Sequence, residues 1–455
     1  MTPRTLLAVF IGKTVNFILK TSGRGATAAP GYYALKVDPN LLEHLAANLD
    51  QVILVTGTNG KTTTSRFIAT ILEKAGVEII HNKAGSNLLR GLVSTLIQDY
   101  PLKSGLTAIF EVDEAVLPLV LDHLTPDYLL VNNLFRDQLD RYGEVSAIQK
   151  LWKEAIKKLP ESTTVLLNSD DPNIADLGRE VAAQVVFFGL EDTKLTTKIP
   201  PHTIDARVCP LDGNPLEYEA FYLAHLGIYR CSSGDFTRPA PTISGERIAL
   251  RGLNSASFTI NFSGPEFEIN LPLSGIYNIY NSLAAASLTH EMGISNSLVK
   301  SGLESPLNVF GRQQTLQVGE KKVVLNLVKN PVGFNEVLRI LTTQKDLNLL
   351  FFLNDKLADG TDVSWIWDVD FETLEGKIKS VVVSGTRGAE LANRLKYASV
   401  FDSEVKVEDD KERALERALT NTKEGETLFV LPTYTAMLSL QKLISSKGMT
   451  KSFWE

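Results

Sequence analysis

The feature that most constrains the fold is a glycine-rich segment at residues 57–63, with the sequence Gly-Thr-Asn-Gly-Lys-Thr-Thr. The apolar run Val52–Val55 precedes it and is typical of a buried strand. Apolar residues return at helical spacing from Thr62 to Ala75, and Gly76 follows them. A loop between a strand and a helix presents backbone N–H groups and the positive end of the helix dipole to an anion. The segment therefore predicts a phosphate-binding loop.

The residue types in this loop suit a nucleoside triphosphate. Two glycines let the backbone bend and approach phosphates closely, a lysine supplies a point charge, and a threonine hydroxyl can ligate Mg²⁺. The common form of the motif has a further glycine at the position of Val55, so this loop is a shorter version. We expect ATP to bind at Gly57, Thr58, Asn59, Gly60, Lys61, Thr62 and Thr63.

Apolar runs alternate with helix-like spacing along much of the chain, which favours an α/β fold with a largely parallel sheet. Residues 197–262 depart from this rhythm and predict a β-rich insertion, and a second α/β set begins near Val323. A chain of 455 residues also exceeds one hydrophobic core. We predict an N-terminal helical segment (1–45), a central ATP-binding domain (46–312) and a smaller α/β C-terminal domain (313–455).

Composition excludes several classes of protein. The net charge is −7 and no run of basic residues stands out, so nucleic acid is a poor candidate partner. Two cysteines in a chain this long argue against a disulfide scaffold and indicate a reducing, cytoplasmic location.

The N-terminal segment is apolar at residues 6–11, but Lys13 and Lys20 interrupt it well short of the roughly 20 residues that a membrane span needs. Two interpretations stay open: an amphipathic helix packed on the protein, and a surface helix that leans on a membrane. We expect at most peripheral membrane contact.

The loop at 57–63 resembles the signature of the Mur ligases and folylpolyglutamate synthases. Further blocks resemble the same family in chain order, at residues 110–114, 133–143, 275–285 and 311–312. The resemblance implies a Mur ligase-type P-loop domain that uses ATP and Mg²⁺ to activate a carboxylate as an acyl phosphate. It places Thr62 and Glu111 on Mg²⁺, Asn278 and Asn281 on adenine, and Arg312 beside the transferring phosphoryl group. A strand-end surface carboxylate for Glu111 and helix capping for the two asparagines are the structural alternatives.

Departures from the family pattern narrow the resemblance. Gln138 stands where most Mur ligases have a metal-binding His, and residues 326–331 lack the usual acidic residue. Only about 50 residues precede the loop, too few for the usual domain that binds a UDP sugar. A UDP-linked substrate is therefore not expected.

With these departures the chain resembles the MurT branch, the synthetase subunits of lipid II isoglutaminyl synthase. Segments that resemble it include 23–27, 135–143, 353–368 and 384–387. The resemblance implies ATP-dependent amidation of the α-carboxylate of D-isoglutamate in the lipid II stem peptide, at the inner face of the membrane. It also implies ammonia from a GatD-type glutaminase in a heterodimer. Asp355 would complete the partner's catalytic triad in trans, with helix capping as its structural alternative.

Three further residues have weaker signals. Lys153 matches a lysine that is carbamylated in some Mur ligases, but neighbouring lysines favour a solvated helix face. Cys209 and Cys231 match a zinc ribbon whose remaining cysteines are Asp212 and Gly234 here. A closed structural zinc site needs four ligands, so we predict a ribbon-like fold without zinc.

Two competing functions stay open at this stage. A stand-alone amino-acid or polyglutamate ligase would use a free amino acid and need no partner. A non-catalytic nucleotide-binding scaffold would only activate a glutaminase. Asp355 argues against the first, and the set formed by Lys61, Thr62, Glu111 and Arg312 argues against the second.

Overall fold

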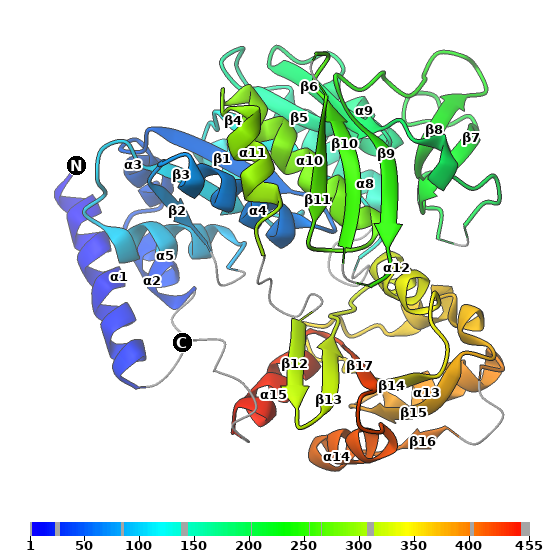
Figure 1. Cartoon of the computed structure of the whole chain (residues 1–455). Helices are drawn as coiled ribbons and strands as arrows, with labels where there is room; N and C mark the ends of the chain where they lie inside the picture. Colours follow the sequence, from blue (N-terminus) through cyan, green and yellow to red (C-terminus); the bar gives the residue numbers. More distant parts are fainter. Residues whose placement is uncertain are drawn as a thin grey trace.

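The computed structural model describes residues 2–22, 28–82, 86–137, 144–201, 203–253, 255–264, 266–306, 314–400 and 405–446. Two large sheets organise these residues, and Figure 1 shows one sheet above the other. Gly23–Thr27, Gln138–Gly143 and Arg312, all singled out above, lie outside the described residues.

The central sheet has nine strands in the order β11-β10-β9-β6-β5-β4-β1-β3-β2. Strands from β2 to β6 pair in parallel, as do β6 and β9, whereas β9, β10 and β11 pair antiparallel. Their bounds are β1 Gln51–Thr56, β2 Ile79–His81, β3 Thr107–Glu111, β4 Tyr128–Val131, β5 Thr164–Asn168, β6 Gln184–Leu190, β9 Ile243–Arg251, β10 Ser255–Asn261 and β11 Phe267–Leu271.

Helices cover both faces of the parallel part of this sheet, which explains why β1, β4 and β5 are continuous apolar runs. In β1, Val52 and Leu54 face one hydrophobic core, and Ile53 and Val55 face the other. One core contains α4 (Lys61–Lys74), α10 (Ile276–Glu291) and α11 (Asn296–Leu303). Helices of the opposite core are α1 Pro3–Thr21, α2 Ala29–Val37, α3 Leu41–Ala46, α5 Leu89–Asp99, α6 Leu117–His123, α8 Val145–Ile156 and α9 Pro172–Ala175.

The predicted insertion is shorter in the structure than residues 197–262. A separate two-stranded sheet is formed by β7 (Leu216–Leu223) and β8 (Leu226–Cys231). Strands β9 and β10 instead belong to the central sheet. Phe258 and Ile260 of β10 are fully buried in the core of that sheet.

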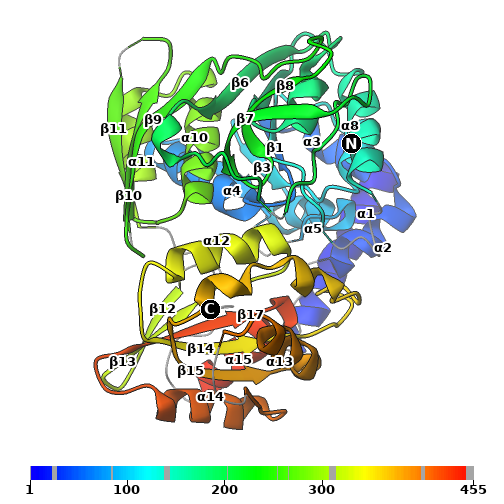
Figure 2. The ribbon, with the colours of Figure 1, turned by 90° about the vertical axis from the view of Figure 1, so that its right-hand side faces the viewer.

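The C-terminal domain has a six-stranded sheet in the order β12-β13-β17-β14-β15-β16. Its strands are β12 Gln314–Val318, β13 Lys321–Leu325, β14 Leu347–Phe352, β15 Ile378–Ser384, β16 Lys406–Val407 and β17 Thr427–Pro432. Its helices are α12 Pro331–Leu341, α13 Gly388–Tyr397, α14 Lys411–Asn421 and α15 Tyr434–Ser446. Figure 2 shows that α12 lies on the side facing the central domain. The predicted α/β fold class, with a ribbon-like insertion and a smaller α/β domain, is confirmed.

Substitution of Gly31 tests how closely the N-terminal helix α2 packs on α5. A Cβ at Gly31 would lie 1.9 Å from the Arg90 carbonyl oxygen of α5, and the Gly31 N–H donates to Ser94 Oγ at 2.8 Å. We expect Gly31→Ala to lower the free energy of unfolding by about 1–3 kcal/mol, because backbone must move to admit the methyl group. Urea denaturation measures this. Gly264→Ala is the control: no heavy atom lies within 4 Å of its added Cβ, and a change of similar size there would contradict the assignment.

Candidate nucleotide site

The glycine loop follows β1 at the centre of the parallel part of the sheet. Its neighbours β3 and β4 lie on either side of β1, so the loops after all three strands meet at one edge. Gly57 has φ 128° and Gly60 has φ 88°, both in the region that favours glycine. A Cβ at Gly60 would lie 2.0 Å from Asn281 Oδ1, so only glycine fits this approach to α10.

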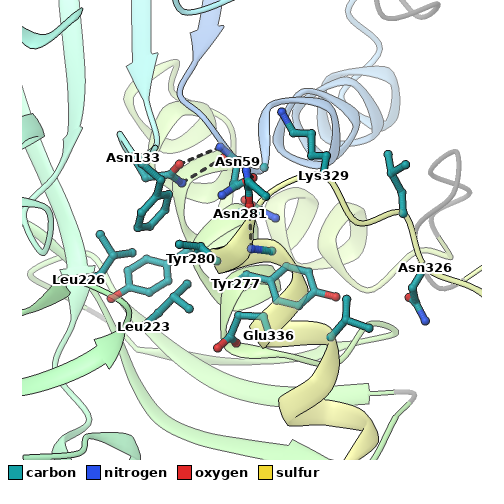
Figure 3. A pocket seen from close by; sticks show the side chains of 17 residues that line it. Asn59, Asn133, Leu223, Leu226, Tyr277, Tyr280, Asn281, Asn326, Lys329 and Glu336 are labelled. Atoms are coloured by element: carbon teal, nitrogen blue, oxygen red, sulfur yellow. Dashed lines mark hydrogen bonds between the residues drawn. The ribbon is translucent and has the colours of Figure 1, made fainter. Parts of the chain in front are cut away.

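Asn133, which follows β4, fixes the backbone of the loop. The Thr58 N–H donates to the Asn133 carbonyl at 3.0 Å. The Asn59 N–H donates to Asn133 Oδ1 at 2.9 Å, and Asn133 Nδ2 donates to the Asn59 carbonyl at 3.1 Å. Figure 3 shows this side-chain pair beside the loop. The loop conformation is therefore set by the adjacent strand end as well as by its own glycines.

Lys61 is the first residue of α4, and its side chain is only 7% exposed. Its ammonium donates to Glu114 at 2.9 Å and to the Gly57 carbonyl at 2.6 Å. Burial raises the pKa of the Glu114 carboxyl above its usual value, while the Lys61 charge opposes that shift. A buried pair of this kind holds the lysine at the loop with its charge balanced locally.

Thr62 and Glu111 meet at the same edge. The Thr62 hydroxyl donates to a Glu111 carboxylate oxygen at 2.8 Å. Asn82 fixes the Glu111 backbone, because its Oδ1 accepts from the Glu111 N–H at 2.9 Å and its Nδ2 donates to the Glu111 carbonyl at 2.8 Å. A hydroxyl and a carboxylate are ligands that Mg²⁺ prefers, so the residues present fit this ion.

A cavity of about 760 Å³ lies next to the loop and opens between the two domains. Asn59, Gly60 and Asn281 line its polar side, and Leu223 and Leu226 of the β7–β8 hairpin line an apolar side. The remaining lining residues are Asn133, Phe135, Tyr277, Tyr280, Asn326, Leu327, Lys329, Asn330, Val332, Gly333, Glu336 and Val337. A pocket that combines apolar and aromatic side chains with several polar groups suits an aromatic base.

The two predicted adenine residues differ in the structure. Asn281 lines the cavity, and its Oδ1 is 3.4 Å from the Thr64 hydroxyl. Asn278 is not among the lining residues; its Nδ2 donates to the Ser274 carbonyl at 2.7 Å, just before α10. Asn281 is therefore placed for a ligand, and Asn278 secures the start of the helix.

The C-terminal domain contributes directly to the loop. Lys329 Nζ lies 2.6 Å from the Asp137 carboxylate, and Asn330 Nδ2 donates to Asn59 Oδ1 at 3.0 Å. A second cavity of about 560 Å³ shares Lys329 and Asn330 with the first. Its other lining residues are Arg136, Asp137, Pro331, Asp359, Asp362, Ser364, Trp365 and Asp368.

Asp355 lies apart from both cavities, in the segment after β14. Its carboxylate accepts from the Thr386 hydroxyl at 2.8 Å and from Arg387 Nε at 2.6 Å. These two hydrogen bonds lower the pKa of Asp355, so it is a carboxylate at neutral pH. Arg387 also binds Glu390 at 2.6 Å.

Lys153 is ion-paired with Asp176, a buried carboxylate, at 2.7 Å. Cys209, Asp212 and Cys231 come together in the ribbon, with one candidate ligand atom from each lying within 4.8 Å of the others. Burial raises the pKa of the Cys209 thiol to about 11. Among the described residues this group offers three ligands rather than four, and the absence of zinc stays a prediction.

Sequence reasoning missed the role of Glu114 and of the hairpin residues Leu223 and Leu226. Glu114 had a usable signal, because it follows a strand that pairs with β1. The hairpin had none, because its place at the cavity depends on how the insertion folds back.

The different positions of Asn278 and Asn281 lead to a prediction. We expect Asn281→Ala to weaken ATP binding about tenfold, because it removes a polar group from the cavity. Asn278→Ala should leave ATP affinity nearly unchanged and lower the free energy of unfolding by about 1–2 kcal/mol, because a buried carbonyl loses its donor. Calorimetric titration and thermal unfolding measure the two effects. Equal losses of ATP affinity would contradict this division of roles.

Solved structures with a similar fold include peptide ligases of cell-wall synthesis. A pseudomurein peptide ligase type C from Methanothermus fervidus aligns with a TM-score of 0.65 at 22% identity, over 87% of this chain and 79% of that one. MurF ligase from Thermotoga maritima in complex with ADP aligns with a TM-score of 0.64 at 16% identity, over 91% and 84%. These similarities establish the fold.

Sequence comparisons are more specific. Residues 55–218 match the Mur ligase middle domain and residues 327–437 match the MurT ligase C-terminal domain. The subunit MurT of lipid II isoglutaminyl synthase (glutamine-hydrolyzing) from Streptococcus pneumoniae is 33% identical over 99% of both chains. The protein of the same name from Staphylococcus aureus strain COL is 32% identical, over 95% of this chain and 96% of the relative. With this near-full-length similarity added to a Mur-type nucleotide site, the chain belongs to the MurT family of Mur ligase-like synthetase subunits.

Proposed function

We propose that this protein uses ATP to amidate the α-carboxylate of D-isoglutamate in the lipid II stem peptide, giving D-isoglutamine. The observation that carries the proposal is the meeting of Lys61, Thr62 and Glu111 at one strand edge, beside a cavity lined by both domains. The names of the relatives supply the substrate class.

The chemistry has two steps. A substrate carboxylate oxygen attacks the γ-phosphorus, the bond to the β–γ bridging oxygen breaks, and ADP leaves. Ammonia then attacks the acyl carbon, the carbon–oxygen bond to phosphate breaks, and the nitrogen loses a proton. A free carboxylate is a poor acyl acceptor, so the first step makes the second possible.

The residues act mainly by position and charge. Lys61 would hold the β- and γ-phosphates, and Arg312 would balance charge on the transferring group. Thr62 and Glu111 would hold Mg²⁺, which neutralises phosphate charge when bound. The second cavity would receive the acceptor peptide beside the γ-phosphate, since it adjoins the nucleotide cavity and shares Lys329 and Asn330 with it.

Ammonia must come from another subunit in this proposal. Both cysteines of the chain are buried in the ribbon, away from the loop. The relatives are named as subunits of a glutamine-hydrolyzing enzyme, which supports a GatD-type glutaminase partner. Asp355 is partly buried, ionised and oriented by Arg387, which suits a carboxylate that orients the partner's histidine.

The substrate also implies a location. Lipid II is named for the relatives, and a lipid-linked substrate stays at the membrane. Within the described residues, no helix has both the length and the apolar character to cross a bilayer. We place the reaction at the inner face of the membrane with peripheral contact.

The central test is a single-turnover assay with γ-labelled ATP. We expect phosphate release that requires both ammonia and lipid II, with amidated lipid II as product, and loss of about 10²-fold or more in rate for Lys61→Ala. Release that requires a free amino acid would favour a stand-alone ligase. No turnover, with partner glutaminase activity still dependent on this chain, would favour a non-catalytic scaffold.

Asp355 has its own test in the complex with the glutaminase. We expect Asp355→Asn to abolish glutamine hydrolysis while ATP binding and amidation with added ammonia persist, because only the partner's histidine loses its carboxylate. Glu390→Gln is the matched control, since it also removes a carboxylate from Arg387. Undiminished glutamine hydrolysis by Asp355→Asn would exclude this role.

A further inference from the structure

Large apolar side chains are exposed together at the N-terminus. In the part of the chain that the structure describes, seven of the sixteen exposed large hydrophobic residues lie before residue 38. Five of them are on α1 and two are on α2, namely Leu6, Leu7, Phe10, Phe17, Ile18, Tyr32 and Tyr33. Phe10 and Phe17 are 67% and 69% exposed. Such clustering is unlike the scattered exposure of an ordinary surface.

The α1 residues occupy one side of the helix. Leu6, Phe10 and Phe17 are spaced by four and seven residues, and Leu7 and Ile18 by eleven, so each set lies along one helical stripe. We call this side the α1 apolar face: Leu6, Leu7, Phe10, Phe17 and Ile18. Figure 1 shows α1 at the edge of the molecule, away from the C-terminal domain.

The opposite side of α1 attaches the helix to the protein through small residues. Thr5, Ala8, Val9 and Gly12 are buried. A Cβ at Gly12 would lie 2.6 Å from Ile97 Cδ1 of α5, so the helix packs closely there. The helix is therefore firmly docked by its small residues, while its largest apolar side chains point to the outside.

Polar groups within the apolar face are already satisfied by the helix itself. The Thr14 hydroxyl donates to the Phe10 carbonyl at 2.9 Å, and the Thr21 hydroxyl donates to the Phe17 carbonyl at 3.0 Å. A hydroxyl that already donates to a helix carbonyl does not need a water molecule as partner when the face is covered. Moving the α1 apolar face out of water therefore carries a small desolvation free energy for these hydroxyls.

The charge of the N-terminal segment indicates which kind of surface covers the α1 apolar face. The first 37 residues contain five basic residues and no acidic one, in a chain whose net charge is −7. Lys20 lies on α1, and Lys36 of α2 lies over the rings of Tyr32 and Tyr33. Basic residues with aromatic and aliphatic side chains are the composition that binds an anionic bilayer surface.

We propose that the α1 apolar face lies on the surface of an anionic membrane, with α1 parallel to the bilayer plane. The proposal deepens the proposed function, since it identifies how a site that consumes a lipid-linked peptide is held near that lipid. A 19-residue helix is about 28 Å long, so the contact extends over many lipids. The contact requires neither ATP nor turnover.

The test is sedimentation of the full chain with its glutaminase partner and vesicles of phosphatidylcholine, with or without phosphatidylglycerol. We expect binding to the anionic vesicles that weakens with salt, and about tenfold or greater weakening by Phe10→Glu/Phe17→Glu. Leu151→Glu/Ile199→Glu is the control, because these side chains are also exposed but lie on other elements. Thermal unfolding and ATP binding check that both double variants are folded.

Activity separates this inference from the proposed function. Phe10→Glu/Phe17→Glu should slow amidation of lipid II in vesicles but leave amidation of a detergent-solubilised substrate unchanged. Vesicle binding without any amidation would reject the proposed function and retain the membrane face. Absence of vesicle binding, equal binding by both double variants, or a wild-type dimer dispersed by Phe10→Glu/Phe17→Glu would overturn the membrane face.

Discussion

The close approach of Gly60 to Asn281 is the constraint on which the nucleotide site depends. It brings the loop after β1 against α10, more than 200 residues later in the chain. The sheet makes this approach possible, because α4 and α10 pack side by side on one face through a shared core. This close contact acts together with the hydrogen bonds from Asn133 to the loop and from Lys61 to Glu114, and all of them hold the loop in place.

The C-terminal domain contributes residues directly to this site. Asn330 binds Asn59 and Lys329 binds Asp137, so two consecutive residues before α12 reach both the loop and the segment after β4. Side chains of both domains line the nucleotide cavity, and the adjoining cavity shares Lys329 and Asn330 with it. The two cavities are therefore connected through residues that line both of them.

Much of the architecture could be predicted, because buried parallel strands appear in the sequence as continuous apolar runs. The apolar runs Val52–Val55 and Tyr128–Val131 fall within β1 and β4 for that reason. The insertion was harder, since alternating residues in β9 and β10 do not reveal which sheet they join. The roles of Asn278 and Asn281 also could not be separated from the sequence, because both stand in one short motif and differ only in what surrounds them.

The sequence by itself determined the phosphate loop, the α/β rhythm and the family, because these depend on local spacing and residue type. Tertiary structure alone decided the partners: Glu114 for Lys61, Asn281 for Gly60 and Arg387 for Asp355. It also decided that the small residues of α1 face the protein and the large ones face outward. The physical reason is that local periodicity sets an element, whereas strand order and helix docking set which elements meet.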